Sequence, residues 1–197
     1  MSVKDYETRL YVKDDLSIGK SLVLKNDQSH YIRSVLRLKE NSQIALFNGE
    51  EGEWLSTIKI ISKKFVELEV IEQIKLQEVI SDIWLVFAPI KRTRIDYLAQ
   101  KATELGAGAL WPIFTKYTSV SRVNAERLRS NSIEAAEQSG RLTVPKILDP
   151  IDFDTLIEKW PHDRHLFCLD ETGKGAPILD AFRSSHQRES GLLIGPE

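Results

Sequence analysis

The feature that most constrains the fold is an alternation of apolar and amphipathic segments, which begins at Ile83 and continues to Ile194. An apolar run at 83–90 is followed by a helical pattern closed by Gly106, and the alternation of strand and helix patterns then continues. Strands that alternate with helices predict a parallel sheet covered on both faces. Further strands are expected at 109–114, 146–148, 165–169 and 191–194, and further helices at 124–139, from 152, and at 177–184.

Ligands of such sheets bind at the carboxyl ends of the strands. In this sequence those ends are predicted at 89–91, 170–173 and 195–197. A phosphate-loop interpretation of Gly173-Lys174-Gly175 fails, because the upstream glycine and the Ser/Thr after the lysine are missing.

The first part of the chain has a different period. In 65–70, Val66, Leu68 and Val70 alternate with more polar neighbours, as in a half-buried strand. Other short strands are expected at 21–24, 43–47 and 54–61, with a hairpin at Asn48-Gly49. Residues 29–37 show helical spacing, which would place Arg33 and Arg37 one turn apart on one face. We therefore expect a small β-barrel with an inserted basic helix at 1–75 and an α/β domain at 76–197.

The composition of the 197 residues, 42% hydrophobic and 28% charged, is that of a globular chain. The apolar run at 83–90 is far shorter than the about 20 residues of a membrane helix, and the polar start has no signal-peptide core. We expect a cytoplasmic protein. The single cysteine, Cys168, excludes an internal disulfide and a multi-cysteine zinc site, and no metal is expected. Its place inside a strand pattern predicts a buried, inert thiol.

Charge is segregated along the chain despite a net charge of only −2. Residues 91–146 hold ten Lys/Arg against five Asp/Glu, and the balance then becomes acidic. This indicates either a surface that faces an anion or two solvated helix faces of different sign. Within the basic segment, Lys91 and Arg94 lie where a strand gives way to a helix, a place that favours phosphate. Solvated cations are the alternative.

Two further sites have open interpretations. Lys101 and Glu104 are three residues apart, and a simple surface pair is the favoured explanation. Arg141 follows the predicted cap at Gly140. Its guanidinium could bind a phosphate, a developing anion on a base or a carboxylate within the fold, or could act only on the charge of a helix end.

Four stretches together resemble the 16S ribosomal RNA uracil-N3 methyltransferases, which belong to the SPOUT class of knotted enzymes. The resemblance covers nearly the whole chain. It is carried by His30 to Arg37, Lys101 to Gly106 (KATELG), Glu134 to Arg141 (EAAEQSGR) and Leu192 to Glu197 (LLIGPE), in the order of the family. It implies a two-domain α+β fold, with a PUA-like β-barrel followed by a SPOUT-type parallel α/β sheet that contains a trefoil knot.

The resemblance also implies the chemistry. A homodimer would transfer a methyl group from S-adenosylmethionine to N3 of a uridine in 16S ribosomal RNA of the small subunit, without a metal. Cofactor contacts would come from Leu169, Asp170, Gly195, Pro196 and Glu197. Arg141 is the candidate for stabilising the uracil anion or positioning its phosphate. Arg33, Arg37, Lys91 and Arg94 are the candidates for RNA backbone contacts.

The family's motif continues beyond Gly-Pro-Glu, whereas this sequence stops at Glu197. We therefore expect a C-terminally truncated chain that binds the cofactor weakly and catalyses little. One alternative is a non-catalytic RNA-binding or ribosome-assembly protein, which would explain the basic segment equally well. A weaker alternative is a small-molecule enzyme with an accessory barrel.

Overall fold

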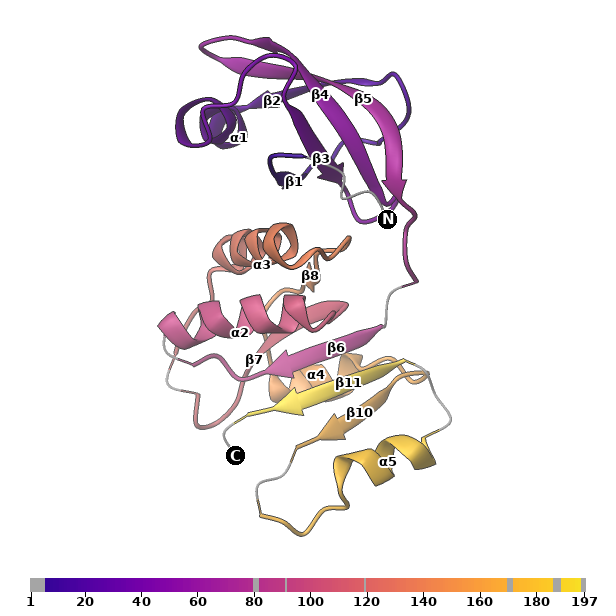
Figure 1. Cartoon of the computed structure of the whole chain (residues 1–197). Helices are drawn as coiled ribbons and strands as arrows, with labels where there is room; N and C mark the ends of the chain where they lie inside the picture. The colour runs from indigo at the N-terminus through magenta and orange to yellow at the C-terminus, as the bar shows by residue number, and fades with distance from the viewer. Residues whose placement is uncertain are drawn as a thin grey trace. The chain divides into compact units, whose positions relative to one another are not determined.

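The computed structural model describes residues 6–79, 82–90, 92–118, 120–169, 172–185 and 189–195. The chain divides into two compact units, Met1–Val79 and Ile80–Glu197, called unit 1 and unit 2 below (Figure 1). Each has its own hydrophobic core, so each is described by itself.

Unit 1 is built on a curled five-stranded sheet with the strand order β1-β3-β4-β5-β2 (Figure 1). Its neighbouring strands are antiparallel except for the parallel pair β1 and β3. The elements are β1 (Arg9–Tyr11), β2 (Ser21–Lys25), α1 (Asn26–His30), the π-helix η1 (Tyr31–Val35), β3 (Gln43–Phe47), β4 (Glu53–Ile61) and β5 (Phe65–Lys75). The sequence pattern predicted β2 to β5 and missed β1, which is only three residues long.

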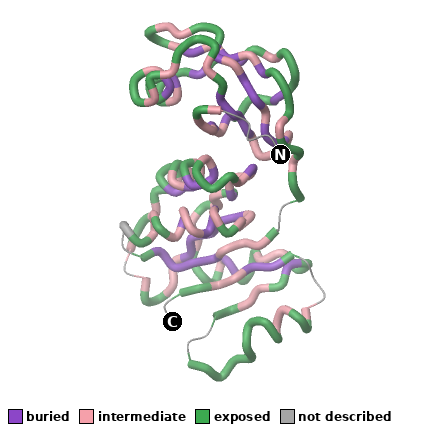
Figure 2. Tube along the Cα trace, in the orientation of Figure 1, coloured by how far each residue is buried: buried purple, intermediate pink, exposed green. Residues whose placement is uncertain are grey.

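The alternation in β5 is confirmed. Val66 and Leu68 are 0% exposed and Val70 is 1% exposed, whereas the residues between them are half-buried (Figure 2). The hairpin at Asn48-Gly49 is also confirmed. Gly49 has a φ of +95°, and the Asn48 side-chain oxygen accepts hydrogen bonds of 3.0 Å from the backbone N–H groups of Glu50 and Glu51. Glycine is favoured where φ is positive, which is why this dipeptide suits the turn.

The helical stretch expected at 29–37 is present as far as residue 35, but the regular winding expected up to Arg37 is wrong. The helical segment starts earlier, as α1, and continues as η1, in which the Leu36 N–H donates to the Tyr31 carbonyl at 2.9 Å, five residues back. Arg37 lies beyond the helix with a φ of +56°. Arg33 and Arg37 are therefore not neighbours on one helical face, because a π-turn and a left-handed residue separate them.

Unit 2 contains a parallel six-stranded sheet with the order β10-β11-β6-β7-β8, to which β9 adds by pairing with β7. The elements are β6 (Ile83–Phe87), α2 (Arg92–Glu104), β7 (Ala109–Phe114), α3 (Ala125–Ser139), β8 (Lys146–Ile147), β9 (Ile151–Asp152), α4 (Phe153–Lys159), β10 (His165–Cys168), α5 (Ile178–Ser184) and β11 (Ser190–Ile194). The predicted alternation of strands and helices is confirmed.

The helices cover the sheet from both faces. Phe87 and Leu110 pack with Ala99 of α2 and Leu128 of α3 on one face, and Leu156 of α4 packs with Val86, Trp111 and Ile113 on the other. The predicted cap at Gly140 is present, with a φ of +78°, and at the other end of α3 the Asn124 side chain accepts from the Arg127 N–H at 3.0 Å. Strand order reverses at β6, which lies between β7 and the late strand β11.

The prediction of a buried Cys168 is wrong. Cys168 is the last residue of β10, the edge strand of the sheet, and it is exposed. An edge strand has a neighbour on one side only, so its apolar pattern does not guarantee burial.

Candidate functional site

The carboxyl ends of three neighbouring strands meet at one edge of the unit 2 sheet. The Leu169 N–H, just after β10, donates to the Leu193 carbonyl at 3.0 Å, and the Ala88 N–H, just after β6, donates to the Ile194 carbonyl at 3.0 Å. Gly195 follows β11 directly. The structure therefore brings the sequence-predicted residues Leu169 and Gly195 to the same edge. Asp170, Pro196 and Glu197 lie outside the described residues.

Gly195 has little room for a side chain. A Cβ at this position would lie 3.3 Å from the Ala88 Cβ and 3.9 Å from the Thr115 Cγ2 atom. Thr115 ends β7 in a turn, where its N–H donates to the Thr118 hydroxyl at 2.8 Å. Gly195 therefore presents only its backbone at this edge, at the point where strand order reverses. In open parallel sheets that is where a ligand binds.

A groove of about 670 Å³ adjoins this edge, between the N-terminal ends of α2 and α3. Its lining is apolar at Ile90, Ile95 and Val123. The lining also includes a charged pair, in which Arg127 donates from Nε and Nη2 to the two carboxylate oxygens of Asp96 at 2.8 and 2.6 Å. Arg94, in the first turn of α2, is exposed. Lys91 lies outside the described residues, so the predicted phosphate site is represented here by Arg94 alone.

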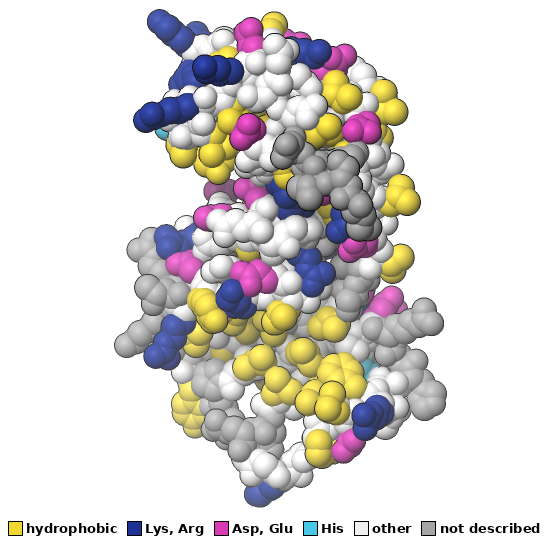
Figure 3. Space-filling view, in the orientation of Figure 1, with side chains coloured by type: hydrophobic (Ala, Val, Ile, Leu, Met, Phe, Trp, Pro, Cys, Tyr) yellow, Lys and Arg dark blue, Asp and Glu magenta, His cyan; other side chains and the backbone are white. Residues whose placement is uncertain are grey.

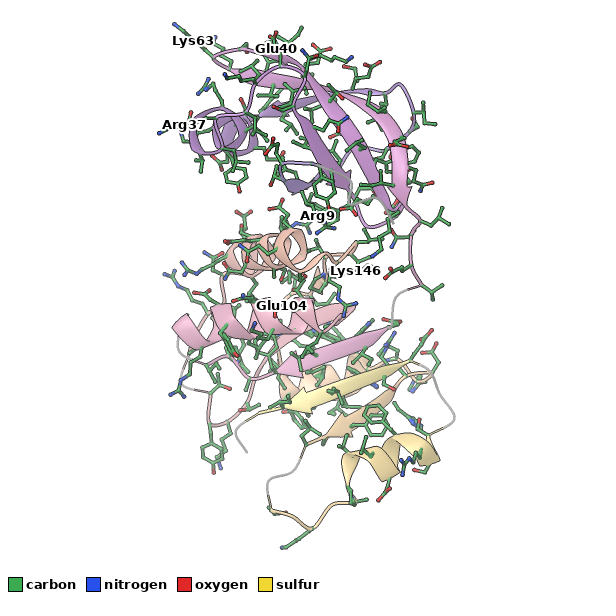
Figure 4. All side chains as sticks on the ribbon, in the orientation of Figure 1. Arg9, Arg37, Glu40, Lys63, Glu104 and Lys146 are labelled. Atoms are coloured by element: carbon green, nitrogen blue, oxygen red, sulfur yellow. The ribbon has the colours of Figure 1, made fainter. Side chains whose placement is uncertain are left out.

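The amino edge of the same sheet holds the other motif residues. Lys101 and Glu104 pair at 2.7 Å on α2, as predicted (Figure 4 labels Glu104). The hydrogen bond between them lowers the pKa of the Glu104 carboxyl and raises the pKa of the Lys101 ammonium. Arg141 donates from Nε to the Glu104 carbonyl at 2.9 Å. Of the interpretations left open by the sequence, helix-end electrostatics is the one this contact supports, and the helix end is that of α2.

The guanidinium of Arg141 also lies flat over Gly106. A Cβ on Gly106 would be 2.7 Å from one of its terminal nitrogens, and Gly106 itself has a φ of +87°. Two residues later the Gly108 N–H donates to the Ile83 carbonyl at the start of β6. Arg141 is therefore at the opposite end of the strands from Leu169 and Gly195.

Cys168 is a poor nucleophile in spite of its exposure. Partial desolvation of the sulfur raises the pKa of its thiol. The reactive thiolate is correspondingly scarce at neutral pH. In the ranges that the structure describes, no three His, Cys, Asp or Glu side chains are grouped in a way that could hold a metal ion. No helix among the described residues is both long enough and apolar enough to span a bilayer.

Comparison with known proteins gives the family. Residues 77–197 match the family described as an RNA methyltransferase domain, and residues 24–71 match the one described as an RNA methyltransferase PUA domain. Ribosomal RNA small subunit methyltransferase E of Rickettsia conorii is 33% identical over 190 residues, which are 96% of this chain and 78% of that protein. The chain belongs to the small-subunit ribosomal RNA methyltransferase E family.

Two other members of this methyltransferase E family extend the match. The Bacillus subtilis enzyme is 29% identical over 198 residues, covering 94% of this chain and 77% of that one. The structure of the Neisseria gonorrhoeae enzyme, bound to S-adenosyl methionine, has a TM-score of 0.86 at 25% identity, covering 98% of this chain and 80% of that chain. The family resemblance and the two-part fold that it implied, a PUA-like sheet and a parallel α/β sheet, are confirmed.

Two of the arginines that the sequence suggested as RNA contacts, Arg33 and Arg37, belong to unit 1. Arg37 is exposed, whereas Arg33 is half-buried and donates to the Ser62 carbonyl at 3.2 Å and to the Lys63 carbonyl (Figure 4 labels Arg37 and Lys63). Lys63, and Ala88 and Thr115 at the carboxyl edge, were not predicted from the sequence. Thr115 directly follows the strand predicted at 109–114, which is a usable signal, whereas Ala88 lies inside the apolar run predicted at 83–90.

Proposed function

We propose that the chain methylates N3 of a uridine in small-subunit ribosomal RNA and takes the methyl group from S-adenosylmethionine. The observation that supports this most directly is the meeting of Leu169, Gly195 and Ala88 at the carboxyl edge of the sheet, in a chain whose relative from Neisseria gonorrhoeae binds that cofactor. The family gives the reaction class, and the position on the base comes from the motif resemblance.

The residues of this edge fit the cofactor. The closeness of Gly195 to Ala88 and Thr115 leaves backbone groups for contact, and a bulkier residue would fill that space. Backbone donors and acceptors at strand ends suit a flat, polar ligand group. When bound, S-adenosylmethionine supplies a methyl group on a positively charged sulfur. Leu169 and Gly195, together with Asp170, Pro196 and Glu197, are the proposed contacts.

The uridine must be presented in a particular state. Its N3–H lies on the Watson–Crick edge, so the base must be unpaired or flipped out of its helix. The N3 proton must leave, and the resulting anion needs a positive partner. Arg141 remains our candidate for this partner. It lies at the amino edge of the strands, and a five-residue strand such as β6 is about 16 Å long. We therefore propose that Arg141 acts in a site formed with a second copy of the chain.

A homodimer is supported by an apolar area of unit 2. Over β10, β11 and α5, hydrophobic side chains gather on the surface (Figure 3). On these elements, Ile194 of β11 is 44% exposed, and Ile178 and Leu179 of α5 are 36% and 65% exposed. Apolar patches of this kind mark association surfaces. Light scattering coupled to size-exclusion chromatography is expected to give twice the chain mass.

Shared catalysis can be tested by mixing two inactive variants. Arg141→Ala and Gly195→Val are each expected to abolish methyl transfer. When the two variants are unfolded and refolded together, dimers with one intact site form, and activity is expected to return to about a quarter of the wild-type value, because half the dimers are mixed and half of their sites are whole. No recovery would show that Arg141 is not supplied by the partner.

The reaction itself is tested with labelled cofactor and small-subunit ribosomal RNA. We expect one labelled uridine, and we expect reverse transcription to stop there, because a methyl group on N3 blocks the Watson–Crick edge. A label at C5 of uracil, away from the Watson–Crick edge, would not stop the transcriptase, and a stop at a base other than uridine would place the methyl group elsewhere; either result would contradict the N3 assignment. RNA binding without any label would favour the non-catalytic RNA-binding protein.

Three further expectations belong to this proposal. The RNA substrate places the reaction in the cytoplasm, where ribosomes are assembled, and the family resemblance implies a trefoil knot. We also expect S-adenosylmethionine to bind at the carboxyl edge of unit 2, where Leu169 and Ile194 are 42% and 44% exposed. Calorimetric titration with S-adenosylmethionine tests this. A titration that shows no binding would refute it.

A further inference from the structure

The turn between β4 and β5 in unit 1 is built to present two lysines. Ser62 and Phe65 close it, with the Ser62 N–H donating to the Phe65 carbonyl at 2.9 Å. The Ser62 hydroxyl oxygen accepts from the N–H groups of Lys64 and Phe65 at 3.2 and 3.0 Å. The two residues at the tip, Lys63 and Lys64, are exposed. The backbone of the turn is thus satisfied internally, and its side chains point into solvent.

Arg33 reaches this turn from η1. Its Nη1 atom donates to the Ser62 carbonyl at 3.2 Å and to the Lys63 carbonyl. These bonds hold the turn against the helical segment and occupy donors that a phosphate would otherwise use. A charge-assisted hydrogen bond to a carbonyl is stronger than a neutral one. Arg33 therefore fixes the backbone of the turn, and the side chains of Lys63 and Lys64 extend from the turn into solvent.

The cations around the turn outnumber the acids. Lys63, Lys64, Arg37 and Lys25 are exposed, and no carboxylate in the described part of the chain forms an ion pair with them. Lys25 pairs with Phe65 across β2 and β5, next to the turn. Glu40 is also near, where it accepts from the Ile61 N–H at 3.5 Å. Figure 3 shows Lys and Arg side chains gathered over α1 and this turn, and Figure 4 shows Lys63 and Arg37 on that side.

Lys59 provides the contrast. It lies on β4 of the same unit, yet its ammonium pairs with the Glu69 carboxylate at 2.6 Å. A paired surface lysine adds little to the field that a distant polyanion meets. The lysines of the turn have no such carboxylate partner in the described part of the chain. Two adjacent ammonium groups, each with three donors, suit consecutive phosphates of one strand.

We propose that Lys63 and Lys64 form, with Arg37, the phosphate-contacting surface of unit 1, and that Arg33 is a positioning residue that holds their turn. The inference rests on the proposed function, because it names the part of unit 1 that contacts the RNA. In this proposal the direct RNA contacts are Lys63 and Lys64, which the motif resemblance did not include, and Arg33 is no longer a direct contact.

The test measures RNA affinity against salt concentration with the full chain and transcribed small-subunit ribosomal RNA. The double variant Lys63→Gln/Lys64→Gln is expected to flatten the slope of log K against log salt by about 1.4 to 1.8, because each lost phosphate contact is worth about 0.7 to 0.9. Lys59→Gln is the matched control and is expected to leave the slope unchanged. An unchanged slope in the double variant overturns the proposal.

Arg33 is tested by combination. Arg33→Gln is expected to weaken RNA binding in the wild-type background and to have no further effect in the Lys63→Gln/Lys64→Gln background. An equal further loss there would show that Arg33 contacts phosphate itself. Arg33→Lys, which keeps the charge but not the fork, is expected to behave like Arg33→Gln. Circular dichroism checks that each variant is folded. Ser62→Ala removes hydrogen bonds within the turn without changing charge, so it is expected to weaken RNA binding in the same direction as Arg33→Gln.

The two proposals fail differently. If the wild-type chain binds RNA with a steep salt slope but transfers no methyl group, the proposed function fails. The role of Lys63 and Lys64 in RNA binding can still be tested from the salt slopes of their variants. If methyl transfer is normal and the lysine variants bind RNA like wild type, the lysine turn fails alone. Binding to an acidic protein instead of RNA would appear as wild-type RNA affinity in all the lysine variants, and it would also overturn the inference.

Discussion

At the scale of single residues, two glycines with similar backbone angles allow the cost of a left-handed backbone to be distinguished from the cost of a side-chain clash. Gly106 and Gly140 have φ values of +87° and +78°, but only a Cβ on Gly106 would meet another group, the Arg141 guanidinium. We expect Gly140→Ala to lower the free energy of unfolding by about 1 kcal/mol, the cost of a left-handed alanine. Gly106→Ala should cost about 2 to 4 kcal/mol, since Arg141 must also move. Urea unfolding of both variants measures these two losses in the free energy of unfolding. Equal losses would show that the Arg141 side chain moves aside at no cost.

The cap formed by Asp152 is expected to make the stability of the protein depend on pH. Its carboxylate caps α4 by accepting from the Thr155 N–H and hydroxyl, both at 2.8 Å, and these bonds hold its pKa below the usual value. A lowered pKa means that the stabilisation is present above the unfolded-state pKa and is lost as pH falls through the folded-state pKa. Asp152→Asn still caps but carries no charge. The urea midpoint of wild type should therefore exceed that of the variant at pH 7, and the gap should close toward pH 2. A constant gap would contradict this account.

At the scale of elements, Arg164 joins the amino ends of two strands. Its side chain is 4% exposed and donates to the Asp82 carbonyl at 2.7 Å, beside β6, and to the Ser190 carbonyl at 3.3 Å, in β11. Hydrogen bonds to charged groups contribute about 1.5 to 3 kcal/mol each, so Arg164→Met should lower the free energy of unfolding of unit 2 by at least about 2 kcal/mol. Arg183→Met is the control, because Arg183 is 79% exposed. Its loss should stay within about 0.5 kcal/mol. Equal effects in the two variants would show that the strand junction does not depend on Arg164.

How far the sequence predicts these elements depends on the range of the forces involved. The strand at Val66 to Val70 and the cap at Gly140 follow from local periodicity and backbone preference, and they are confirmed. The π-turn before Arg37 leaves no distinctive spacing. The contact of Arg141 with the Glu104 carbonyl joins residues 37 apart. The exposure of Cys168 depends on strand order, which periodicity does not encode. Leu169 and Gly195 were placed on one edge because parallel strands end together, and that general rule is confirmed by their geometry.

At the scale of the whole molecule, the separate cores predict separate unfolding. Ile58 is 0% exposed in the core of unit 1, and Leu110 is 0% exposed in a core of unit 2. Truncation of either side chain to alanine should cost about 2 to 5 kcal/mol. Three of the four tryptophans, Trp84, Trp111 and Trp160, lie together in unit 2 with ring centroids 5.8 to 6.1 Å apart, so fluorescence follows mainly that unit.

Leu110→Ala should therefore shift the fluorescence transition to lower urea, and Ile58→Ala should leave it nearly in place. Hydrogen exchange measured by mass spectrometry should show the reverse for β3, β4 and β5, where Ile58→Ala speeds exchange. If Ile58→Ala moved both signals together, the two units would unfold as one, and the proposed RNA-contacting surface of unit 1 would be coupled in stability to the proposed cofactor edge of unit 2. Independent transitions mean that each unit keeps its own site intact while the other unit is perturbed, which is the condition under which the lysine and Arg141 variants report on binding and chemistry separately.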